Sequence, residues 1–141
     1  MRRLTTLAVL ALLVSGCGGS GGGVSESEHV SAVVHRYFSS FANGNGAELC
    51  PLLTQSAQDK MVEVVESDER ELGRSDTVPT CPEAVKFFGR VALFKSAKVI
   101  AVSITGTNAI GTVKVGSFHT GSVTLSKTAA GWLINNLPGQ T

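Results

Sequence analysis

The sequence predicts an α+β domain in which helices come first and a small antiparallel sheet follows. Between residue 25 and about residue 92, apolar side chains recur at three- and four-residue steps, which is the period of amphipathic helices. From Lys98 onward the pattern changes to an alternation of apolar and polar residues, which is typical of half-buried strands. This order favours N-terminal helices packed on a curved antiparallel sheet of about four strands.

The first predicted helix covers residues 25–43. Ser25 or Ser27 can cap its start, and the sequence Asn-Gly-Asn-Gly at 43–46 ends it. Its buried stripe is expected to contain Val30, Val33, Val34, Tyr37, Phe38 and Phe41.

Three further helices are predicted before the sheet. A short one covers residues 47–53, and Thr54 caps the next, which runs to about Arg70. The last opens with Thr80-Cys81-Pro82-Glu83, where threonine is the cap and Glu83 completes a capping box.

The four strands are expected at residues 98–104, 109–115, 118–127 and 132–136, with turns at 106–108 and 128–131. Alternation in the first strand places Ile100, Val102 and Ile104 on one face.

The charge balance argues against nucleic acid as a partner. The chain has 12 basic and 11 acidic residues, and Arg2 and Arg3 lie in the predicted signal. The remainder is nearly neutral and has no basic stripe, and no Asp or Glu follows Glu83.

The N-terminus has the parts of a secretory signal peptide over residues 1–16: two arginines, an apolar segment and a small-residue end. Val14-Ser15-Gly16-Cys17 resembles the lipobox of bacterial lipoproteins. The resemblance implies cleavage before Cys17, a diacylglyceryl group on its thiol and acylation of its amine, with palmitate as a typical chain. Residues 17–27 are then the lipidated cysteine and a flexible Gly/Ser-rich linker, and we expect the protein at the extracytoplasmic face of the cell membrane.

Lipidation leaves Cys50 and Cys81, which we expect to form a disulfide in an oxidising compartment. A metal pair or a redox pair is the alternative. Neither has the usual Cys or His spacing here.

Two segments resemble the nuclear-transport-factor-2-like superfamily, a cystatin-like α+β roll that includes ketosteroid isomerases and polyketide-cyclase-like proteins. They are Tyr-Phe-Ser-Ser-Phe-Ala-Asn-Gly-Asn-Gly at 37–46, and Val-Thr-Leu-Ser-Lys at 123–127 followed by Gly-Trp-Leu-Ile at 131–134. Uncharacterised actinobacterial lipoproteins look similar. The resemblance implies a roll over residues 28–137, followed by a short tail at 138–141, and says little about activity.

No catalytic set is expected, because no strand supplies the carboxylate that the superfamily's enzymes use. The three histidines, His29, His35 and His119, lack metal-ligand spacing, so neither a metal nor a cofactor is predicted. The candidate pocket residues of the roll are Tyr37, Ile100, Val102, Ile104, Phe118 and His119.

The leading hypothesis is a non-catalytic domain that binds a small apolar ligand or an envelope protein. One alternative is a polyketide-cyclase-like enzyme that uses His119 and Tyr37. Another is a purely structural partner in an envelope complex. The sequence does not indicate an oligomeric state.

Overall fold

The computed structural model describes residues 23–73, 79–88, 92–117 and 119–136. The predicted signal peptide, Cys17, most of the linker, Phe118 and the C-terminal tail lie outside the described residues. Within the described part of the chain, no helix is long and apolar enough to cross a membrane.

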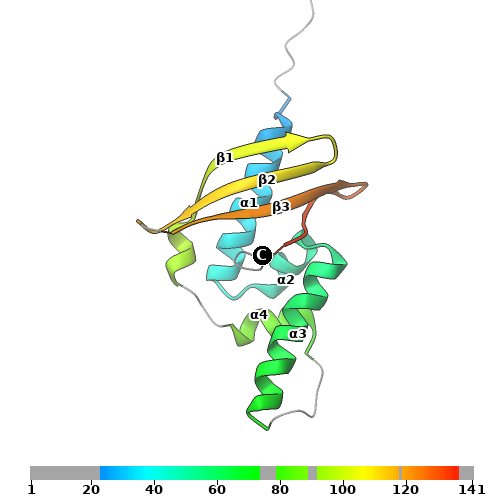
Figure 1. The fold of residues 1–141 in the computed structure, drawn as a ribbon, viewed down its shortest axis with the longest axis vertical. Helices are drawn as coiled ribbons and strands as arrows, with labels where there is room; N and C mark the ends of the chain where they lie inside the picture. The colour runs from blue at the N-terminus through cyan, green and yellow to red at the C-terminus, as the bar shows by residue number, and fades with distance from the viewer. Residues whose placement is uncertain (1–22, 74–78, 89–91, 118, 137–141) are drawn as a thin grey trace, which may run out of the picture.

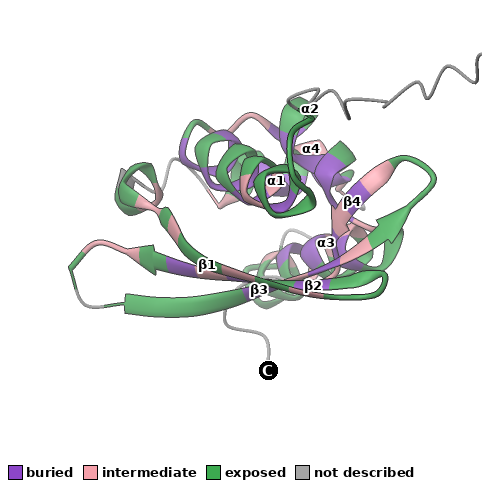
Figure 2. Ribbon diagram, turned by 90° about the horizontal axis from the view of Figure 1, so that it is seen from above, coloured by how far each residue is buried: buried purple, intermediate pink, exposed green. Residues whose placement is uncertain are grey.

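The domain is α+β, as the sequence predicts: helices pack on one face of a four-stranded antiparallel sheet (Figure 1). Viewed from above, α1 lies across one side of the sheet (Figure 2). The helix α1 spans Glu26–Ala42 and buries the predicted apolar stripe, except for Val33, which is half-buried. Ser25 and Glu28 form the capping box at its start.

The second predicted helix is broken in two. The α-helix α2 covers only Gly46–Leu49, and a 3-10 turn, η1, covers Cys50–Leu52. Pro51 is the physical reason, because it has no N–H to donate and its ring prevents α-helical continuation.

The next two helices start where the sequence predicts. Thr54 caps α3, Gln55–Glu71, and Thr80 with Glu83 caps α4, Cys81–Phe87. A 3-10 helix that the sequence did not reveal, η2, covers Ala92–Ser96 and leads into the sheet.

The strands are β1 Lys98–Thr105, β2 Asn108–Val115, β3 His119–Thr128 and β4 Gly131–Ile134, in the spatial order β1-β2-β3-β4. The helical half is joined to β4 by a backbone hydrogen bond of 2.9 Å from the Thr54 N–H to the Ile134 carbonyl. Gly111 of β2 allows α1 to approach the sheet, since a Cβ at this position would lie 3.2 Å from a methyl of Val34.

Aromatic rings fill the space between α1, α4 and η2. The ring of Phe41 lies 5.2 Å from Phe94 and 6.0 Å from Phe88, and Phe38 lies 5.4 Å from Phe94. Beneath α1, the sheet contributes buried Val113, Val123 and Leu125. These side chains belong to one hydrophobic core between the helices and the sheet.

Candidate functional site

The first strand corrects one part of the predicted pocket. The pairing of β1 with β2 is interrupted between Val99 and Ala101, so Ile100 occupies a bulge. The extra residue shifts the alternation, and Ile100 is 55% exposed, whereas Val102 and Ile104 pack against the core. The expectation that these three side chains share one face is therefore wrong for Ile100.

Tyr37 lies within the aromatic cluster, with its ring centroid 5.1 Å from that of Phe38 and 6.0 Å from that of Phe41. The residue is only 3% exposed. Burial raises the pKa of its hydroxyl far above the ordinary value, because the charged form would lose its hydration. This hydroxyl stays protonated at working pH.

His119 begins β3 opposite Val115, so the register places it on the helix-facing side of the sheet. The side chain is nevertheless exposed, because it lies at the end of the strand. Among the described residues, no hydrogen bond links His119 with Tyr37, the pair on which the enzyme alternative depends.

Cys50 and Cys81 form the predicted disulfide, with their Cα atoms 6.1 Å apart and both residues buried. The bond ties η1 to the start of α4 across a sequence separation of 31 residues. Closing a loop of this size stabilises the fold by about 3–4 kcal/mol on the chain-entropy account.

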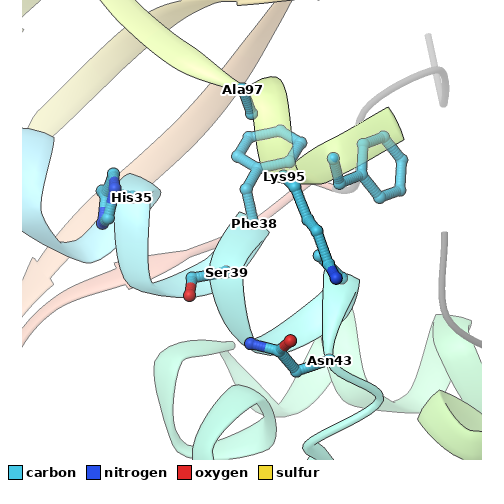
Figure 3. A pocket seen from close by; sticks show the side chains of 8 residues that line it. His35, Phe38, Ser39, Asn43, Lys95 and Ala97 are labelled. Atoms are coloured by element: carbon cyan, nitrogen blue, oxygen red, sulfur yellow. The ribbon is translucent and has the colours of Figure 1, made fainter. Parts of the chain in front are cut away.

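A hollow of about 180 Å³ lies where the last two turns of α1 meet η2, and none of the described residues of the predicted pocket lines it (Figure 3). His35, Ser39 and Asn43 follow one another along α1, and the Lys95 side chain extends from η2 toward the turn that holds Asn43. The apolar part of the wall comes from Phe38, Ala42, Phe94 and Ala97.

The four polar side chains of the hollow are chemically available. Within the described residues, none of them forms a hydrogen bond or an ion pair with another part of the protein. They offer an ammonium group, an imidazole, a hydroxyl and an amide beside two aromatic rings. The arrangement is suited to binding a small polar molecule with an apolar part.

His35 is exposed on α1. The i, i+4, i+8 spacing of His35, Ser39 and Asn43 was the available signal, since it places all three on one face of a helix. Nothing in the sequence indicated that Lys95 approaches this face.

A second cavity, of about 350 Å³, lies between α3 and the residues that lead into α4. Asp59, Glu63 and Glu66 line it from α3, opposite Pro79 and Thr80. Among the described residues, no group of three or more His, Cys, Asp or Glu side chains is placed to hold a metal ion.

No protein-family model matches this chain, and no curated protein is similar to it.

Proposed function

We propose that this chain is a lipid-anchored lipoprotein of the extracytoplasmic membrane face, whose nuclear-transport-factor-2-like roll is a non-catalytic binding domain. The site is the hollow between α1 and η2. The observation that carries the proposal is the set of four polar side chains that line this hollow and have no protein partner within the described part of the chain. Polar groups that converge beside apolar walls are the usual make-up of a small-ligand site.

The state of Tyr37 supports binding rather than catalysis. General acid–base chemistry needs a group whose protonation changes near working pH and that can reach the substrate. Tyr37 is sealed among phenylalanines, and its pKa is raised by burial. His119 is exposed at the start of β3, and among the described residues it forms no hydrogen bond with Tyr37.

Two features support the anchor and its location. Val14-Ser15-Gly16-Cys17 has the lipobox pattern after a charged and apolar lead-in. The disulfide between Cys50 and Cys81 is the kind of bond that persists outside the cytoplasm.

A ligand screen against a variant with a filled hollow tests the binding role. We expect saturation-transfer NMR on the intact chain in lipid nanodiscs to find small molecules that bind saturably to the wild type. Ser39→Phe should abolish their binding, because a benzyl group at this exposed position occupies the hollow. Ala32→Phe is the matched control, since Ala32 is exposed on the same helix and does not line the hollow.

Two outcomes would contradict the proposal. One is a screen in which no molecule distinguishes Ser39→Phe from Ala32→Phe. The other is turnover of a bound molecule that falls by roughly a hundredfold in His119→Ala, the usual loss when a general base is removed. A binding domain should keep its affinity in His119→Ala to within about tenfold.

A further inference from the structure

The hollow between α1 and η2 is lined by a positively charged side chain and by no negatively charged one. Lys95 supplies an ammonium group, His35 and Asn43 supply N–H donors, and Ser39 supplies a hydroxyl. None of the residues that line it carries a carboxylate. Lys95 would repel a cation placed in the hollow, and no carboxylate there would offset the repulsion. An anion would instead accept a charge-assisted hydrogen bond from Lys95.

The C-terminal end of α1, where carbonyl groups normally attract cations, offsets this preference only in part. The Ser39 carbonyl accepts a hydrogen bond from the N–H of Asn43, and the Phe41 carbonyl accepts one from Gly44. The Ser40 carbonyl accepts one from Asn45 at 2.8 Å. Three of the last carbonyl groups of α1 therefore already accept hydrogen bonds from the chain itself.

The apolar wall and the volume define the rest of the ligand. Phe38 and Phe94 present rings at 5.4 Å from each other, and Ala42 and Ala97 leave room beside them. A volume of about 180 Å³ corresponds to roughly six water molecules of liquid volume. The hollow therefore suits one small molecule that has an apolar side and a single charged group.

We propose that the hollow binds a small organic carboxylate, with its charged group at Lys95 and Asn43 and its apolar part against Phe38 and Phe94. The inference rests on the proposed binding function and specifies its ligand class.

Three molecules of nearly equal shape test the charge preference: benzoate, benzamide and benzylamine. Their binding to the intact chain in nanodiscs is measured by saturation-transfer NMR, with empty nanodiscs as the blank. We expect benzoate to bind with a Kd on the order of 1 mM or below, and at least about tenfold more tightly than neutral benzamide. Benzylamine should bind more weakly than benzamide.

Two lysine variants test whether Lys95 holds the charged group of the ligand. Lys95→Gln should weaken benzoate binding about fivefold or more and leave benzamide unchanged, because it removes the cation and keeps a polar side chain at this position. Lys114→Gln is the control, since Lys114 is exposed on the sheet and does not line the hollow. It should change benzoate binding less than twofold.

Each contrary result overturns the carboxylate inference, and the results separate it from the binding role. Equal binding of benzoate and benzamide that is lost in Ser39→Phe would leave a ligand site without anion preference. Equal losses in Lys95→Gln and Lys114→Gln would show only general attraction to a basic surface. Absence of benzoate binding, while other molecules in the screen still depend on Ser39, would refute the ligand class alone.

Discussion

Gly46 allows α2 and α4 to approach each other closely. It begins α2 and is buried against α4, where a Cβ would lie 2.5 Å from the Cα of Pro82 and 2.7 Å from its carbonyl oxygen. Both contacts are to backbone, which cannot rotate away as a side chain can. The disulfide between Cys50 and Cys81 holds the two segments together beside this contact. Glycine is therefore required here by space and not by an unusual backbone angle.

Gly46→Ala should lower the free energy of unfolding by about 1–3 kcal/mol, the usual cost of overpacking a tight contact. Urea unfolding followed by circular dichroism measures the change. Gly121→Ala is the matched control, because Gly121 lies in exposed β3 and no atom lies within 4 Å of a Cβ there. Equal stability of the two variants would show that α2 and α4 can move apart at little cost.

Carboxylates fix the starts of two helices, and one of them also fixes the helix to the sheet. Glu28 accepts a hydrogen bond from the N–H of Ser25, and Glu83 accepts one from Thr80. Glu26, the first residue of α1, pairs with Lys127 and accepts a 2.6 Å hydrogen bond from the indole N–H of Trp132. The first turn of α1 is thereby attached to the β3–β4 hairpin.

These contacts predict acid sensitivity. Hydrogen bonds from Lys127 and Trp132 lower the pKa of Glu26 below its ordinary value of 4.5, and the caps lower the pKa of Glu28 and Glu83 likewise. A carboxyl with a depressed pKa in the folded state stabilises the protein above the unfolded-state pKa. That stability is lost as the pH falls from about 4.5 through the lower, folded-state values.

We therefore expect the unfolding free energy to fall below about pH 4.5, as measured by urea unfolding across a pH series. Glu26→Gln should be less stable than wild type at neutral pH and should show a weaker dependence on pH in the acid range. Glu63→Gln, in an exposed position on α3, serves as the control. A pH profile of Glu26→Gln that is parallel to the wild-type profile would contradict the assignment.

Helix boundaries were predictable where a local signal fixes them. The caps at Thr54 and Thr80 act through hydrogen bonds within four residues, so the sequence alone locates them, and it narrows the first cap to Ser25 or Ser27, of which Ser25 is the cap. Strand positions followed from alternation for the same reason. The bulge at Ile100 was not predictable, because it depends on how β1 is paired with β2.

The hollow was not predictable for a related reason. The sequence indicates an ordinary solvent-exposed face of α1 for His35, Ser39 and Asn43. Only tertiary packing brings η2 beside these residues. The 3-10 helix is short and has no strong sequence pattern of its own. A site formed between two distant segments depends on tertiary structure, whereas the disulfide was predictable because only two cysteines remained to pair.

On the scale of the whole molecule, the acidic residues are concentrated towards one end of the long axis. The start of α1, where the linker enters, and the outer end of α3 lie at opposite ends of the long axis (Figure 1). The α3 helix carries most of the acidic residues: Asp59, Glu63, Glu66, Asp68, Glu69 and Glu71. For a protein tethered at its N-terminus, this arrangement allows the acidic end to lie far from the membrane surface. Anionic lipids at that surface would repel acidic side chains that came close to it.

Cys17→Ser tests the tether itself. The thioether to diacylglycerol needs the thiol, and each buried methylene of the acyl chains contributes about 0.8 kcal/mol to membrane attachment. The variant should lose metabolic labelling with a fatty acid and should leave the washed membrane fraction. The double variant Cys50→Ser with Cys81→Ser is the control: it breaks the disulfide and lowers stability but leaves Cys17 in place, so it should keep the label. Label and membrane attachment that persist in Cys17→Ser would refute the lipobox assignment, and a label lost only in the double variant would place the acyl group on another cysteine.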